Sequence, residues 1–105
     1  MWFIFPQLQG LGFSSMARKF AISSRAEADA YLEHPLLGPR LRECAALVNL
    51  VKRCSIEEIF GSPDDMKFRS SMTLFAHASA DNRVFMEALR QYCGGQFDQL
   101  TLDRL

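Results

Sequence analysis

Apolar residues recur every three or four positions along most of the chain, which is the spacing of one face of an α-helix. Together with cap residues and breakers, this pattern predicts helices over residues 25–33, 39–51, 56–60, 64–78 and 82–93. Further short helical segments are expected over residues 16–20 and near Thr101. No run alternates convincingly between apolar and polar side chains, so no strand is predicted.

Capping residues mark several of the expected helix ends. Ser24 with Glu27 and Ser55 with Glu58 have the spacing of a capping box, in which the serine oxygen accepts a backbone N–H and the glutamate reaches back to the cap. Ser62-Pro63-Asp64-Asp65 combines a cap, a proline for the first helical position and two acids for the positive end of the helix dipole. The sequence therefore predicts an all-α fold, a single compact domain over residues 1–105 with five or six helices joined by short loops.

Composition and charge exclude several classes of protein. The 105 residues are 49% hydrophobic and include 9 Phe, which is enough apolar material for one core. The 12 Lys and Arg balance the 12 Asp and Glu, so the chain lacks the basic surface that binding of nucleic acid or of an anionic membrane requires. Its 3 cysteines match no metal or CxxC spacing, and we expect a reduced, cytoplasmic protein with these side chains in the core.

The chain opens on four large apolar residues, Trp2, Phe3, Ile4 and Phe5. They follow no basic segment and form too short a run for a signal peptide or a membrane span. Because chain ends usually fray into water, these side chains need cover. They dock in the core of this chain, or they pack against a preceding segment, in which case residues 1–105 are an N-terminally incomplete domain.

Catalytic motifs are scarce. The sequence contains no glycine-rich phosphate loop, no HExxH, no GxSxG and no paired Cys/His ligand set, so no cofactor and no metal site are predicted. His34 lies at a helix end, where it is expected to serve the last carbonyls, and His77 is expected on the solvated side of the helix over 64–78. Catalytic residues remain unassigned, and the sequence does not decide whether the protein is an enzyme.

The densest group of polar side chains opens the helix over residues 64–78. Its candidate ligand-binding residues are Asp64, Asp65, Lys67, Arg69 and Ser70. In one interpretation the acids cap the helix, Asp65 pairs with Arg69 four residues later, and Lys67 is solvated. In the other, the helix start and the segment after Arg69 line a polar cleft. The two carboxylates would repel a phosphate there and favour a hydroxyl-bearing ligand or a cation.

The N-terminal segment contributes two further candidates. Gln7 lies in a predicted loop over residues 6–12 that contains two glycines, and it would present its amide to a ligand, although a plain turn is the simpler interpretation. Trp2 would stack on a ring of the ligand.

Four segments closely resemble a family catalogued as domain of unknown function 1810, small and mainly helical bacterial proteins sometimes labelled calpastatin. The segments are residues 1–8 (MWFIFPQL), Met16-Ala17, residues 31–44 (YLEHPLLGPRLREC) and residues 59–75 (IFGSPDDMKFRSSMTLF). The resemblance spans almost the full chain and implies no known activity. It departs at Phe20, where the family usually has Tyr, and at Cys93, where it usually has Phe. Because members usually continue upstream of the first segment, the resemblance implies that Met1 is an internal or late start.

Two functions of different classes follow. In the first, the protein binds or processes a small polar ligand held by Trp2, Gln7 and the polar group that opens the helix over 64–78, with a carboxylate as general base. A nucleotide- or ADP-ribose-like ligand is suggested because His34-Pro35, with Phe60-Gly61 further on, resembles the ADP-ribose-linked NADAR proteins. In the second, the protein is a non-catalytic interaction module that uses the exposed aromatic N-terminal segment. The oligomeric state stays open.

Overall fold

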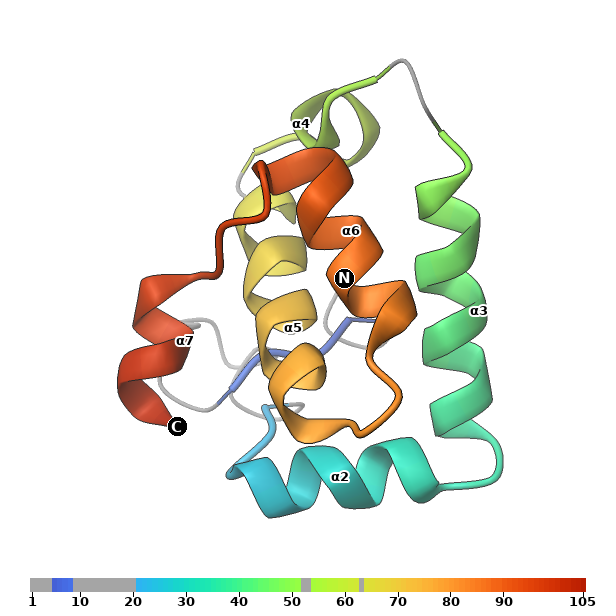
Figure 1. The fold of residues 1–105 in the computed structure, drawn as a ribbon, viewed down its shortest axis with the longest axis vertical. Helices are drawn as coiled ribbons and strands as arrows, with labels where there is room; N and C mark the ends of the chain where they lie inside the picture. Colours follow the sequence, from blue (N-terminus) through green and yellow to red (C-terminus); the bar gives the residue numbers. More distant parts are fainter. Residues whose placement is uncertain (1–4, 9–20, 52–53, 63) are drawn as a thin grey trace.

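The computed structural model describes residues 5–8, 21–51, 54–62 and 64–105, and these contain six helices and no strand. Figure 1 shows α5 in the middle of the molecule, with α2 crossing below it, α3 and α7 at opposite edges and α4 above. The helices are α2 (Arg25–Glu33), α3 (Leu37–Asn49), α4 (Ile56–Phe60), α5 (Asp64–Ala78), α6 (Arg83–Cys93) and α7 (Gln99–Arg104). The all-α prediction is confirmed, while the segment expected to be helical over residues 16–20 lies outside the described residues.

Local capping explains where α2 and α4 begin. The Ser24 hydroxyl accepts the Glu27 N–H at 3.1 Å, as the sequence predicts, but the Glu27 carboxylate reaches one residue further back and accepts the Ser23 N–H at 2.9 Å. At α4 the capping box is complete, because Ser55 and Glu58 exchange both bonds. Each pairing satisfies N–H groups that a helix start leaves without an intrahelical partner.

α3 begins earlier than the sequence indicates, because a histidine caps it. The imidazole Nδ1 of His34 accepts the N–H groups of Leu36 and Leu37, both at 3.1 Å. The imidazole of His34 therefore serves the start of α3, and not the last carbonyls of α2 as expected; those carbonyls, of Ala30 and Tyr31, accept the His34 backbone N–H. Leu36 already has helical backbone angles, and Pro39 lies in the first turn, where its missing N–H costs nothing.

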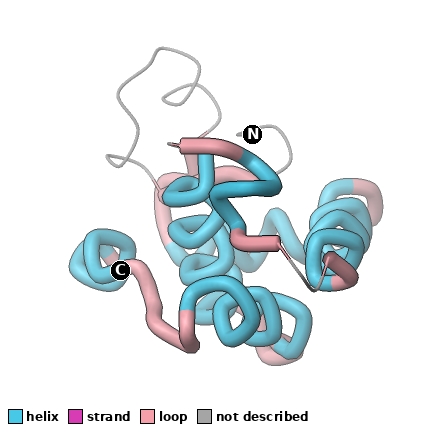
Figure 2. The backbone as a smooth tube through the Cα atoms, turned by 90° about the horizontal axis from the view of Figure 1, so that it is seen from above, coloured by secondary structure: helices cyan, strands magenta, loops and turns pink. Residues whose placement is uncertain are grey.

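α5 is the core of the fold. It packs against α2, α4, α6 and α7, most extensively against α6, and Figure 2 shows it surrounded when the molecule is viewed from above. Burial consequently extends all round its middle, over Phe68 and residues 70–76, and not along the single stripe that its apolar residues predict. Polar Ser71 and Thr73 are fully buried with the phenylalanines.

Phe5 docks in the core of this chain. It is 3% exposed, and its ring lies 5.0 Å from that of Phe68 and 6.0 Å from that of Phe60. Leu8 is also buried and forms an isolated parallel bridge with Ile22. The expectation of an exposed aromatic partner surface is therefore wrong at Phe5, whereas Trp2 lies outside the described residues.

The last two turns of α6 hold the C-terminal end of α3. The hydroxyl of Tyr92 lies within hydrogen-bonding distance of the carbonyl oxygens of Val51, at 2.7 Å, and of Val48, and the Gln91 side-chain amide donates to the carbonyl oxygen of Val51 at 3.0 Å. Between these two valines, the amide of buried Asn49 donates to the carbonyl oxygen of Val84, in the first turn of α6, at 3.1 Å. The apolar spacing over residues 39–51 predicts Val51 on the buried side of this helix, but Asn49 is inside and Val51 is outside.

All three cysteines are free thiols, as expected, but they are not all in the core. Cys44 and Cys93 are half-buried, and Cys54 is exposed. No described helix combines the length and the apolar character that a membrane span requires.

Candidate functional site

The polar cluster, which we define as Asp64, Asp65, Lys67, Arg69 and Ser70, follows a tight turn between α4 and α5. Gly61 forms this turn with φ 76°, a backbone conformation that glycine adopts without strain. Its carbonyl oxygen accepts the Asp65 N–H at 2.9 Å. Both carboxylates therefore lie on the first turn of α5, where the helix dipole favours negative charge.

Asp64 and Lys67 pair with each other at the surface. The ammonium nitrogen of Lys67 lies 3.7 Å from a carboxylate oxygen of Asp64, and both side chains are partly exposed. Such a pair contributes a few tenths of a kcal/mol, roughly, because water screens it. The Asp64 carboxylate and the Lys67 ammonium therefore partner each other within the first turn and a half of α5.

Arg69 fastens the segment between α6 and α7 to α5. Its Nη2 donates to the carbonyl oxygen of Phe97 at 2.9 Å, and its Nε donates to that of Gln96 at 3.3 Å. Among the described residues it forms no ion pair with Asp65, whose Oδ1 instead accepts the Met66 N–H at 2.9 Å. The pairing of Asp65 with Arg69 expected from their spacing is therefore wrong.

Two further candidates, Ser70 and Gln7, bond to other parts of the chain. The Ser70 hydroxyl is buried and donates to the Met66 carbonyl oxygen one turn back, at 3.0 Å. Gln7 uses its carbonyl oxygen to accept the Ile22 N–H at 2.8 Å, and its side chain is half-buried. Trp2 lies outside the described residues.

Asp65 and Arg69 do share one concavity, a depression of about 170 Å³ between α4, α5 and the end of α6. Its lining residues are Ile56, Asp65, Met66, Arg69, Tyr92 and Cys93. We call it the Asp65–Arg69 depression. Of the six candidate residues that the structure describes, this depression thus brings together Asp65 and Arg69.

The sequence does not single out Tyr92 or Cys93 as residues that line the depression. Its one indication concerns Cys93. Cys93 stands where the resembling family usually has Phe, in the last turn of α6. Burial raises the pKa of the Cys93 thiol, and the nearby Asp65 carboxylate raises it further, whereas the charge of Arg69 acts in the opposite direction. Cys93 therefore lines the depression as a protonated thiol at neutral pH.

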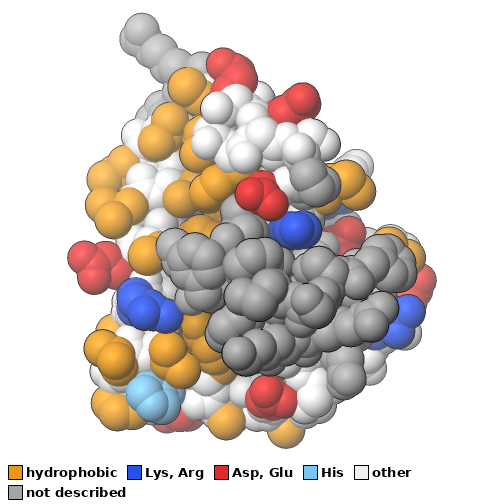
Figure 3. All heavy atoms as spheres, turned by 180° about the vertical axis from the view of Figure 1, so that it is seen from behind, with side chains coloured by type: hydrophobic (Ala, Val, Ile, Leu, Met, Phe, Trp, Pro, Cys, Tyr) orange, Lys and Arg blue, Asp and Glu red, His pale blue; other side chains and the backbone are white. Residues whose placement is uncertain are grey.

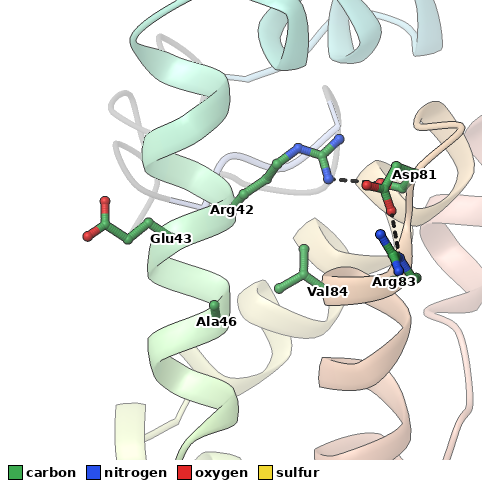
Figure 4. A pocket seen from close by; sticks show the side chains of 6 residues that line it. All are labelled: Arg42, Glu43, Ala46, Asp81, Arg83 and Val84. Carbon is green, nitrogen blue, oxygen red and sulfur yellow. Dashed lines mark hydrogen bonds and ion pairs between the residues drawn. The ribbon is translucent and has the colours of Figure 1, made fainter.

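A second depression, of about 390 Å³, lies between α3 and the start of α6 (Figure 4). Arg42 points across it, donates to the Asp81 carbonyl oxygen and to the Ser79 hydroxyl, both at 2.8 Å, and lies over the ring of Phe85. Asp81 also pairs with Arg83 at 3.2 Å. Its charged groups therefore hold the loop between α5 and α6.

Within the described segments, no three His, Cys, Asp or Glu side chains are grouped as ligands for a metal ion.

The described residues form six helices, of which α5 is buried by four of the others, and shallow depressions with a few charged side chains lie on the surface of this small all-helical domain. The chain belongs to the family described as "Protein of unknown function (DUF1810)", whose model matches residues 1–105.

The fold of this chain is closely similar to that of a protein with a solved structure. The crystal structure of the conserved hypothetical protein Rv1873 from Mycobacterium tuberculosis matches with a TM-score of 0.97 and 58% sequence identity. The match covers 99% of this chain and 74% of that chain. No protein with a curated description matches. The family resemblance seen in the sequence is confirmed, and the similar solved structure comes from a bacterium, as the resemblance implies.

Proposed function

We propose that the protein binds a small polar ligand in the Asp65–Arg69 depression. The observation that carries the proposal is that a carboxylate and a guanidinium, on successive turns of the central helix, line the same concavity beside the ring of Tyr92. Ligand sites typically combine an apolar lining with a few convergent polar groups.

The polar groups of the depression complement each other. The Asp65 carboxylate accepts hydrogen bonds, and the guanidinium of Arg69 carries five N–H donors, of which the bonds to Gln96 and Phe97 use Nε and Nη2. Because those bonds fix the guanidinium plane, a ligand would not need to order it. A pair of neighbouring hydroxyls on one sugar ring, which donate and accept together, would suit an acceptor and a donor placed in this way.

The size of the depression limits what it would hold. Pockets for drug-sized ligands measure about 300 Å³ or more, so about 170 Å³ corresponds to one ring or another small polar group. For a nucleotide- or ADP-ribose-like ligand, we propose that a ribose enters while the remainder lies across the adjacent surface. Ile56 and Met66 would cover the apolar edge of the ring.

The competing function, an interaction module based on the aromatic N-terminal segment, loses support at Phe5, because that side chain is packed against Phe60 and Phe68. The exposed apolar side chains of the described residues lie elsewhere, along α3 and its ends, on α5 and α6, and on α7 and the C-terminal Leu105.

An NMR titration tests the proposal. Uniformly labelled protein is titrated with ribose, AMP and ADP-ribose up to millimolar concentration, and we expect amide shifts confined to the first two turns of α5 and the last turn of α6. Asp65→Asn keeps the shape of the side chain and removes its charge, so it is expected to weaken binding about tenfold, the loss of one charge-assisted hydrogen bond.

Asp64→Asn is the matched control, because Asp64 precedes Asp65 on the same turn and pairs with Lys67 outside the depression. It is expected to leave binding unchanged. Absence of any shift with all three compounds, or equal losses in the two variants, would contradict the proposal.

A further inference from the structure

α3 presents one long face to solvent. It contacts α2 and α6 on its inner side and stands at the edge of the molecule in two perpendicular views (Figures 1 and 2). Leu41, Ala45 and Asn49 are buried on the inner side. The opposite face is exposed along the whole helix and carries several large apolar side chains.

The exposed residues of this face follow a heptad spacing. We define the α3 stripe as Leu36, Arg40, Glu43, Leu47 and Leu50, which are separated by four, three, four and three residues. At 100° per residue they fall within a sector of roughly 80°. Leu36, Leu47 and Leu50 are 65%, 56% and 71% exposed. In Figure 3, apolar side chains gather along the left edge, which α3 forms, above and below an acidic side chain.

We propose that the α3 stripe is a self-association surface, which pairs antiparallel with the α3 stripe of a second copy of this chain. A two-fold axis that passes between Leu41 and Arg42 places Arg40 opposite Glu43 of the second copy and Glu43 opposite its Arg40. The same axis places Leu36 opposite Leu47 of the second copy, and the reverse. Two leucine layers then enclose two reciprocal ion pairs, an isologous arrangement that closes as a dimer.

The charge pattern selects this orientation and register. Parallel pairing would place Arg40 against Arg40 and Glu43 against Glu43, and like charges across a helix interface oppose association. Sliding the antiparallel pair by one heptad places Arg40 and Glu43 against leucines, which removes water from both charges and forms no ion pair across the interface. Only the register centred between Leu41 and Arg42 pairs every charge with its opposite and Leu36 with a leucine.

The dimer is expected to be weak. Residues 36–50 span about 21 Å at 1.5 Å per residue, so one helix pair buries less than the roughly 1,200 Å² of stable complexes. A dissociation constant on the order of 10 μM to 1 mM is typical of such contacts. The surface is separate from the Asp65–Arg69 depression, so the inference stands independently of the proposed function.

The first test is the molar mass of the full chain by sedimentation equilibrium from about 10 μM to about 1 mM, the range set by the expected affinity. We expect a reversible monomer–dimer equilibrium. Leu47→Arg is expected to weaken dimerisation at least about 100-fold. The two-fold axis puts one substituted arginine in each of the two leucine layers, so both layers lose an apolar contact. Leu100→Arg is the matched control: Leu100 is 63% exposed but lies on α7, and this variant is expected to associate like the wild type. Circular dichroism checks that both variants are folded.

The second test exchanges the charges. Arg40→Glu and Glu43→Arg each place like charges opposite one another in the homodimer, so each variant alone is expected to lose at least about tenfold in affinity. An equimolar mixture of the two is expected to form a heterodimer, because one stripe is then acidic and the other basic. Mixing changes no contact within either chain, so recovery reports the interface alone.

A wild-type chain that stays monomeric to millimolar concentration overturns the proposal. So does a Leu100→Arg variant that loses association to the same extent as Leu47→Arg, or a mixture of the two charge variants that stays monomeric while the wild type dimerises.

Discussion

The guanidinium of Arg69 donates a hydrogen bond of 2.9 Å to the carbonyl oxygen of Phe97, 28 residues further along the chain. This bond joins the second turn of α5 to the link between α6 and α7. Next to it, the Thr73 hydroxyl accepts the Asp98 N–H at 2.9 Å. Two polar side chains of the central helix therefore hold the backbone that leads into the last helix, and α7 depends on them for its position.

Replacing Arg69 with methionine is expected to destabilise the protein. Methionine retains an unbranched stem but donates nothing to Gln96 and Phe97, and bonds from a charged donor contribute about 1.5 kcal/mol or more. Urea unfolding measures the loss in free energy of unfolding. Arg83→Met, at an exposed arginine that pairs with exposed Asp81, serves as control and is expected to change stability by less than about 0.5 kcal/mol. Equal effects of the two substitutions would rule out the tethering role.

Phe5→Ala is expected to cost about 3–5 kcal/mol, because it empties a buried site between two aromatic rings. Thermal or urea unfolding measures this loss. Leu36→Ala removes an exposed side chain and is expected to leave stability nearly unchanged. A small loss for Phe5→Ala would show that the N-terminal segment contributes little to the core.

The capping box of α4 makes stability depend on pH. Hydrogen bonds from the backbone and side chain of Ser55 lower the pKa of Glu58 below 4.5. A carboxyl whose pKa is lower in the folded state stabilises the fold above its unfolded pKa and loses this contribution as the pH falls through the folded value. The stability difference between wild type and Glu58→Gln is therefore expected to shrink between about pH 5 and about pH 3.

Glu57→Gln, one residue earlier in the same turn, is the control for this series, because the capping bonds run through Glu58. Urea unfolding at each pH gives the differences. A Glu58→Gln difference that does not change with pH would contradict the assignment.

The cysteines are expected to differ in reactivity. Cys54 is exposed, whereas burial raises the pKa of half-buried Cys93 above its usual value of 9.0 and lowers its thiolate fraction at any given pH. A thiol reagent near neutral pH, followed by mass spectrometry of the peptides, is expected to label Cys54 first. The two cysteines are expected to react alike once urea unfolds the chain. Faster labelling of Cys93 in the folded protein would show that Arg69 outweighs burial.

Helix positions followed closely from the sequence, because periodicity and caps act within one segment. The bounds of α2 and α4 are those predicted, and α5 begins and ends where its acids and its apolar pattern indicate. The side of each helix that is buried was less predictable. Ser71 is buried because other helices pack against α5 on several sides. The apolar pattern of α5 itself does not indicate how many helices pack against it.

The candidate site was predictable only in part for the same reason. Asp65 and Arg69 are one helical turn apart, so their shared depression follows from local spacing. Tyr92 and Cys93 join them only through the packing of α6 against α5, which residues 92–93 do not encode by themselves. Gln7 is a candidate only because of the composition of its loop. In the fold, its backbone carbonyl oxygen accepts the Ile22 N–H.

The Tyr92 hydroxyl carries one hydrogen and faces two carbonyl oxygens, those of Val48 and Val51, so it donates to one of them at a time. With either acceptor, the hydrogen bond holds the backbone at the C-terminal end of α3 and opposes fraying of its last turn. Leu47 and Leu50 flank Val48 on that turn, and their side chains are held out on a backbone that is already ordered. When a partner binds these leucines, α3 therefore loses little conformational entropy, because its backbone is ordered beforehand. The Tyr92 side chain lowers this entropic cost of association from within the chain, without contacting the partner.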